Sequence, residues 1–202
     1  AREMGLRVQF SVENRRFTVE QTKKLAYILT DDYPIDDLEF ITEETGAWND
    51  DMGYATAQLD TAAAAIKALE ADPGFAGRVK QLKLGIYCVV RSRLDGLYHH
   101  AREILPDHYI TVLSQYASIG VAGSYPYFIK SAEDLRWAEL YSWVEFDGQM
   151  YLQQNHIPGI DSLLAQMDRT APGVQHNSLL FNHWRTAENR TSFRYAAEAT
   201  IA

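Results

Sequence analysis

The chain has 202 residues, enough for one substantial domain, and its 47% hydrophobic and 23% charged residues are typical of a globular protein. Its formal net charge of -8 argues against non-specific nucleic-acid binding, which needs a basic surface. Cys88 is the single cysteine, which excludes an internal disulfide, and no apolar run reaches the roughly 20 residues that span a bilayer. We therefore expect neither a nucleic-acid partner nor a membrane, and the compartment stays open.

The first half of the chain alternates between strand and helix patterns. The elements expected, in chain order, are strand 5–13, helix 18–34, strand 37–48, helix 56–71, strand 82–90 and helix 95–106. Thr18 with Gln21 three residues later has the form of a capping box at a helix start, and Pro34 ends that helix. The alanine run "TAAAAIKALEADPG" is a strong helix former that stops at Asp-Pro-Gly.

The second half continues the alternation. The elements expected are strand 108–118, helix 131–139, strand 140–146, helix 159–171, strand 177–184 and helix 190–202. Six strands alternating with helices indicate βαβ units and a parallel sheet, and several strands are read as apolar on both faces, as helix-covered strands should be. Two architectures fit this pattern: an open doubly wound sheet, or part of a (β/α)₈ barrel.

The barrel is the favoured interpretation, because no Gly-x-Gly-x-x-Gly or Gly-Lys-Ser/Thr loop follows any strand. Barrels carry their function at the C-terminal ends of the strands. Those ends are rich in polar and aromatic residues here: Glu13, Asn14, Arg15, Arg16, Glu43, Glu44, Trp48, Arg91, Arg93, Gln115, Tyr116, Trp143, Glu145, Asp147, Asn182, His183, Trp184 and Arg185.

This mixture suggests a carbohydrate ligand, because sugar rings stack on Trp while their hydroxyls bond Asn, His, Arg and carboxylates. Glu145 stands out among the carboxylates, since "SWVEF" places it inside an aromatic strand where a carboxylate must be paired, hydrogen-bonded or protonated. The plainer alternatives remain open at this point. Each Trp can be packing in the core, the Glu residues can be salt-bridged to Arg91 or Arg185, and His183 can be structural.

Metal and cofactor chemistry find no support in the sequence. His99 and His100 are adjacent and point about 100° apart on a helix, so they do not make a metal-binding pair. No Gly-x-Ser-x-Gly elbow indicates a serine hydrolase. We therefore expect no metal and no cofactor.

Three segments together resemble a known family. "FITEETGAW", then "LYSWVEFDGQ" three strands later, then "LLFNHWRTAENR" as the closing strand, resemble the (β/α)₈ glycoside hydrolases of the large clan with catalytic carboxylates on barrel strands four and seven. "WVEFDGQMYLQQN" is also similar to barrel segments of the alpha-glucuronidases and related polysaccharide-processing enzymes. The usual Asn-Glu of strand four is replaced here by Thr42-Glu43 or Glu43-Glu44.

The resemblance implies a single barrel domain over 1–202 whose six βα units correspond to strands three to eight. Because six strands cannot close a standard eight-strand barrel, the first two βα units are expected to be supplied by a missing barrel portion or by another copy of the chain.

The resemblance also implies a glycoside hydrolase acting on a poly- or oligosaccharide, with Glu44 or Glu43 as general acid and Glu145 as nucleophile or base. The residues expected to bind the sugar are Trp48, Trp143, Asp147, Asn182, His183, Trp184 and Arg185. Arg16, Arg91, Arg93 and Arg185 at the rim would suit a uronate.

Two other functions remain as alternatives. One is a non-catalytic carbohydrate-binding relative of the barrel enzymes. The other is an enzyme of another class, such as a phosphosugar aldolase or isomerase, which ranks last because the lysines fall mainly in helices and at strand starts.

Overall fold

The computed structural model describes residues 7–43, 52–87, 91–116, 137–143 and 177–180, with the single residues 161, 165, 194, 195 and 198. For 91–92, 113–116, 140–143 and 177–180 it describes the backbone only. The chain divides into two compact units, Ala1–Thr111 and Val112–Ala202.

The first unit alternates strands and helices in the order that the sequence predicts. Its elements are β1 (Gln9–Glu13), α1 (Val19–Asp32), β2 (Asp37–Ile41), α2 (Met52–Glu70), β3 (Gln81–Ile86) and α3 (Arg91–Ile104), and β4 (Ile110–Tyr116) begins at its end. The second unit contains the rest of β4, β5 (Ala138–Trp143) and β6 (Asn177–Leu180). The fold class is therefore α/β.

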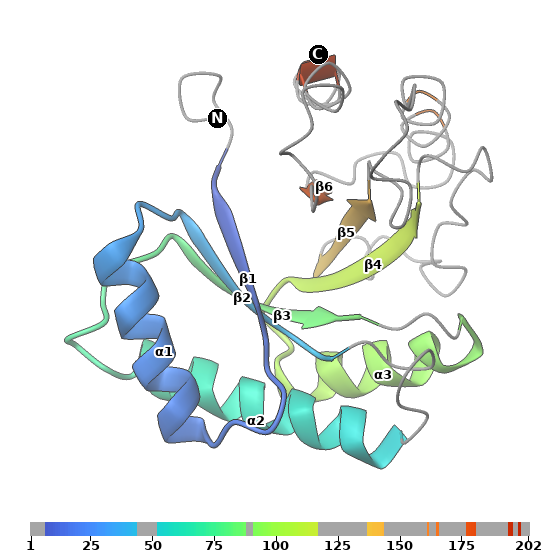
Figure 1. Cartoon of the computed structure of the whole chain (residues 1–202). Helices are drawn as coiled ribbons and strands as arrows, with labels where there is room; N and C mark the ends of the chain where they lie inside the picture. Colours follow the sequence, from blue (N-terminus) through green and yellow to red (C-terminus); the bar gives the residue numbers. More distant parts are fainter. Residues whose placement is uncertain are drawn as a thin grey trace. The chain divides into compact units, whose positions relative to one another are not determined.

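The strands that pair within each unit are parallel, as predicted (Figure 1). In the first unit Ser11 lies beside Glu39, and Glu39 lies beside Lys83, so β1, β2 and β3 are neighbours in chain order. In the second unit β5 pairs with β6 from Leu140 opposite Asn177 to Trp143 opposite Leu180. Parallel neighbours require crossover connections, which α1 and α2 provide in the first unit.

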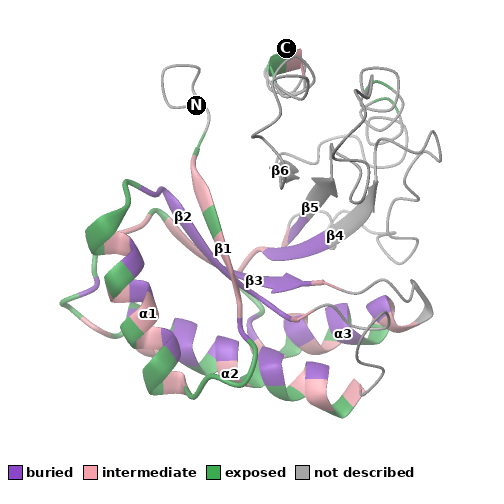
Figure 2. Cartoon of the chain, viewed as in Figure 1, coloured by how far each residue is buried: buried purple, intermediate pink, exposed green. Residues whose placement is uncertain are grey.

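The apolar core of the first unit lies between its sheet and its helices. All three helices cover the same face of β1–β3 (Figure 1). Leu38, Phe40, Leu84 and Ile86 point to that face and are at most 1% exposed. The alanine-rich side of α2 is buried against β2 and β3, where small side chains let the helix approach the sheet closely, and buried residues concentrate along these elements (Figure 2).

The opposite face of β1–β3 is polar, in contrast to the expectation of strands that are apolar on both faces. Because side chains alternate along a strand, the odd-numbered residues share this second face. They include Gln9, Ser11, Asp37, Glu39 and Lys83. Every residue of β2 is buried, so Asp37 and Glu39 are buried carboxylates inside a strand.

Several boundaries differ from the predicted ones. The capping box at Thr18 and Gln21 forms as expected, with both hydrogen bonds present. β2 ends at Ile41 rather than at 48, because the N–H of Glu43 turns to a side chain of α2 instead of continuing the strand. α2 and α3 each begin four residues earlier than predicted, which places Arg91 and Arg93 in the first turn of a helix.

In the second unit, Ala138 and Glu139 belong to β5, whereas the sequence pattern predicts a helix up to 139. Both side chains are at most 1% exposed, so burial in a strand prevails there over the helical pattern. The remaining predicted elements of this unit lie largely outside the described residues.

Candidate strand-end site

The C-terminal ends of β1 and β2 lie at one edge of the sheet. Glu13 and Ile41 are neighbours in the pairing, and the N–H of Asn14 still donates to Ile41 O at 2.7 Å. On β2, the N–H of Thr42 donates to Gly85 O of β3 at 3.0 Å. The residues that follow these strands therefore leave the sheet side by side, which is where a parallel α/β fold carries its chemistry.

Glu43 leaves this edge with its backbone and its side chain both held by α2. Its N–H donates to Gln58 Oε1 at 3.0 Å, and Tyr54 donates its hydroxyl to Glu43 Oε2 at 3.1 Å. Tyr54 and Gln58 are four residues apart, so they project from the same face of the helix. Two side chains from the first turns of α2 thus hold Glu43 at two points, its backbone N–H and its carboxylate.

Gln58 also connects Glu43 to the end of β1. Its Nε2 donates to Arg15 O at 3.3 Å, and its own backbone carbonyl accepts from Asn14 Nδ2 at 3.0 Å. Asn14 in turn accepts from Thr22 Oγ1 of α1 at 3.1 Å. Because Asn14 is 1% and Gln58 4% exposed, these hydrogen bonds supply partners that buried amides need.

Two arginines border Glu43. Arg15 contacts Glu13 Oε2 with Nε at 2.9 Å and Nη2 at 2.8 Å. The pKa of Arg15 is raised first by this hydrogen bond to Glu13, then by the negative charge of Glu13 and by that of Glu43. The guanidinium of Arg16 lies 5.9 Å from the ring centroid of Tyr54. The edge therefore combines carboxylates, which can move protons, with guanidiniums, which can bind anionic groups.

The predicted site residues are described to different extents. Glu43 lies two residues after the last residue of β2, and Trp143 ends β5. The others lie outside the described residues: Glu44, Trp48, Glu145, Asp147, Asn182, His183, Trp184 and Arg185. The pairing of Glu43 or Glu44 with Glu145 stays a prediction, as does the sugar subsite around the tryptophans.

Tyr54 and Gln58 lie in a helix and not at a strand end, so the strand-end pattern does not predict them. One signal was present for Gln58. It falls in the buried stripe of α2 between Ala55 and Ala62, at a position where an amphipathic helix normally carries an apolar residue. A lone amide in such a stripe indicates a hydrogen-bond partner elsewhere in the chain.

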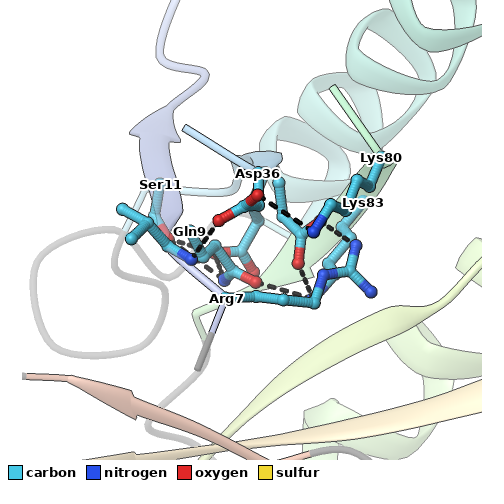
Figure 3. A network of polar contacts seen from close by, with 9 residues as sticks. Arg7, Gln9, Ser11, Asp36, Lys80 and Lys83 are labelled. Carbon is cyan, nitrogen blue, oxygen red and sulfur yellow. Dashed lines mark hydrogen bonds and ion pairs between the residues drawn. The ribbon is translucent and has the colours of Figure 1, made fainter. Parts of the chain in front are cut away.

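A second polar group lies on the face of β1–β3 opposite the described helices, and we call it the sheet-face cluster (Figure 3). Its members are Arg7, Gln9, Ser11, Asp37, Glu39 and Lys83. Lys83 Nζ lies 2.8 Å from Gln9 Oε1 and 3.3 Å from Asp37 Oδ2, and Glu39 accepts from Gln9 Nε2 at 3.0 Å and from the hydroxyl of Ser11. Arg7 forms an ion pair with Asp37.

This cluster belongs to the beginnings and middles of the strands. Beside it, Asp36 accepts from the N–H of Val8 at 2.9 Å and lies 3.2 Å from Lys80 Nζ (Figure 3). Apart from Arg7, the residues of the sheet-face cluster come from β1, β2 and β3, so the cluster links these three strands.

Among the described residues no group of three or more His, Cys, Asp or Glu side chains is arranged to hold a metal ion. Within the same described segments, no helix combines the length and apolarity needed to cross a membrane. A scan against protein-family models, a search of curated proteins and a search of solved structures each found no match to this chain.

Proposed function

We propose that this chain belongs to a glycoside hydrolase in which Glu43 is the general acid of a pair of strand-end carboxylates. The observation that carries the proposal is the fixed position of Glu43, which follows a parallel strand and is held by Tyr54 and Gln58. In glycoside hydrolysis one carboxyl group protonates the leaving oxygen and a second acts as nucleophile or base. Glu145 is the proposed second member.

The order of the strands and the side on which the helices lie in the first unit favour a barrel rather than a doubly wound sheet. In a doubly wound sheet the strand order reverses, which puts helices on both faces. Here β1, β2 and β3 follow one another in order and all three helices lie on one side (Figure 1). Successive right-handed crossovers in one direction give this one-sided arrangement, which a (β/α) barrel requires.

The arginines at this edge support an acidic sugar as substrate. Arg15 and Arg16 follow Asn14 after the end of β1. The charge of Glu43 acts on Arg15, and the guanidinium of Arg16 lies over the ring of Tyr54, which holds Glu43. A guanidinium matches the two oxygens of a carboxylate in geometry and charge. A uronate-containing saccharide is therefore the substrate class we propose first.

The test is hydrolysis by the natural full-length polypeptide. The substrates are a panel of 4-nitrophenyl glycosides that includes glucuronides, together with uronate-containing polysaccharides, and the readouts are nitrophenol and reducing-end release. Glu43→Gln keeps the shape of the side chain and removes its acid function, so kcat should fall by about 10²-fold or more. Glu20→Gln is the matched control, because Glu20 is an exposed residue of α1.

Two results would overturn the proposal. Turnover of Glu43→Gln at the wild-type rate would remove Glu43 from the chemistry. Binding of oligosaccharides without release of reducing ends from any substrate would favour the non-catalytic carbohydrate-binding alternative.

A further inference from the structure

We propose that Gln58 is a positioning residue, which sets the place of the Glu43 carboxyl group by holding the backbone of both neighbouring strand ends. The inference rests on the proposed function of Glu43 and adds to it a residue on a helix. It assigns Gln58 no contact with substrate.

The side-chain amide of Gln58 forms hydrogen bonds to the chain beyond both strand ends. One primary amide serves both strands, since Oε1 accepts from the N–H of Glu43 and Nε2 donates to the carbonyl of Arg15. The two bonds fix the offset between the chain leaving β1 and the chain leaving β2. Tyr54, one turn earlier on α2, then holds the far end of the Glu43 side chain.

Placing an amide at this position costs free energy. Gln58 is 4% exposed and its helical neighbours in the core, Ala55, Leu59 and Ala62, are apolar and at most 1% exposed. An apolar side chain of similar length would fill the same space without desolvating an amide. The amide therefore has a role beyond packing. Its hydrogen bonds to Glu43 and Arg15 indicate that this role is to align the two strand ends.

Acid catalysis is sensitive to the position of the acid. A carboxyl group misplaced by about 1 Å can lose about 10²-fold in rate, because the proton must be delivered along a defined line. Loss of the Gln58 amide frees the backbone of Glu43 without changing its chemistry. The expected signature is a lower kcat with little change in KM.

A first experiment tests the geometry without any substrate. In Gln58→Met the N–H of Glu43 loses its acceptor, so its hydrogen exchange, followed by NMR, should be at least tenfold faster than in the wild type. Gln9→Met is the matched control. It makes the same chemical change in the sheet-face cluster, at the other end of β1, and should leave the exchange of the Glu43 amide unchanged.

A second experiment tests the role in turnover, using the glycoside panel described above. Gln58→Met should lower kcat by tenfold or more, Tyr54→Phe should lower it as well, and Gln9→Met should keep the wild-type kcat. In the Glu43→Gln background, Gln58→Met should have no further effect on the residual rate, because a positioning residue acts only through the group that it positions.

The outcomes separate this inference from the function that underlies it. If Glu43→Gln retains the wild-type rate, the proposed function fails whatever Gln58 does. If Glu43→Gln is inactive but Gln58→Met keeps the wild-type kcat, or lowers the residual rate of Glu43→Gln as strongly as that of the wild type, Gln58 is not a positioning residue. Unchanged exchange of the Glu43 amide in Gln58→Met would remove the geometric basis itself.

Discussion

At Gly85 the lack of a side chain is what lets the Glu39 carboxylate lie against β3. A Cβ at this position would stand 2.4 Å from Glu39 Oε1 and 2.8 Å from Ile41 Cβ, which is closer than such atoms approach one another. Glu39 is fully buried and accepts through Oε2 from Gln9 and Ser11, so a rotation of the carboxylate that moves Oε1 away from a Cβ at position 85 would also move Oε2 away from these donors.

The prediction is that Gly85→Ala lowers the free energy of unfolding by about 1–3 kcal/mol, through overpacking of a filled site. Gly96→Ala is the control, because a Cβ there meets nothing within 4 Å and the residue lies inside α3, where Ala should stabilise by about 0.5–1 kcal/mol. Urea denaturation of both variants measures the difference. A Gly85→Ala protein as stable as the wild type would contradict the tight contact.

Two lysines that both pair with carboxylates should differ sharply in their contribution to stability. The side chain of Lys83 is 4% exposed and faces Asp37, which is 3% exposed, whereas that of Lys80 is 65% exposed. Lys83→Met removes one of the two cations that pair with the buried carboxylate of Asp37, leaving Arg7, and should cost about 3 kcal/mol. Lys80→Met should cost about 1 kcal/mol or less, because the Lys80 side chain lies largely in water and Asp36 keeps its hydrogen bond from the N–H of Val8. Equal losses in chemical denaturation would mean that Lys83 is not buried in solution.

At the scale of elements, a tyrosine–aspartate contact joins α1 to the turn that follows α2. Tyr27 donates its hydroxyl to Asp72 Oδ2 at 2.8 Å, and its ring packs edge-on against Phe75. The hydrogen bond from Tyr27, followed by that from the N–H of Gly74, lowers the pKa of Asp72 below its ordinary 3.8. The same bond to Asp72, followed by burial, raises the pKa of Tyr27 above its ordinary 10.0.

The two pKa shifts define the pH range in which Tyr27→Phe should destabilise the protein most. Because the pKa of Asp72 is lowered on folding, its contribution is present above pH 3.8 and is lost as the pH falls through the folded-state pKa. Because the pKa of Tyr27 is raised, its contribution is present below pH 10.0 and is lost as the pH rises through the folded-state pKa. The difference in Tm between wild type and Tyr27→Phe should therefore be greatest between these values and shrink on both sides. A difference that is constant with pH would rule out this linkage.

The elements also show what a sequence can and cannot reveal. The start of α1 was predictable because Thr18 and Gln21 are three residues apart and cap the helix with their own side chains. The buried carboxylates of β2 were not, because their partners lie far away in the sequence: Ser11 is 28 positions before Glu39 and Arg7 is 30 positions before Asp37. Glu43 could be placed after a strand, but the residues that hold it, Tyr54 and Gln58, belong to a helix whose position depends on the folded sheet.

At the scale of the whole molecule, β1 carries exposed aromatic surface at its start. Phe10 is 37% and Tyr33 52% exposed, and their rings stack with centroids 5.8 Å apart. In the described part of the chain β1 pairs with β2 alone, so its other side presents backbone groups that another strand can bind. Apolar side chains beside an unpaired strand edge favour association with a further strand or a second copy.

The prediction is that the chain self-associates through this edge. In sedimentation velocity runs the weight-average sedimentation coefficient of the wild type should rise with concentration, and Phe10→Lys/Tyr33→Lys should abolish the rise. Ile28→Lys is the control, because Ile28 is an exposed apolar residue of α1. A wild-type chain that sediments as a monomer at all concentrations would contradict association through β1.

The sheet-face cluster has a consequence for how the strands find their alignment during folding. A slip of β2 by one residue against its neighbours would turn Asp37 and Glu39 toward the helices, into the apolar layer of Leu84 and Ile86, and would turn Leu38 and Phe40 to the polar face. Burying those charges without partners would cost several kcal/mol each. A slip of two residues keeps each side chain on its own face of the sheet, but it moves Lys83 away from Glu39. It also moves Gly85, whose missing side chain provides the space that the Glu39 carboxylate occupies. The buried charges thus disfavour misaligned pairings and help to specify the register of the sheet.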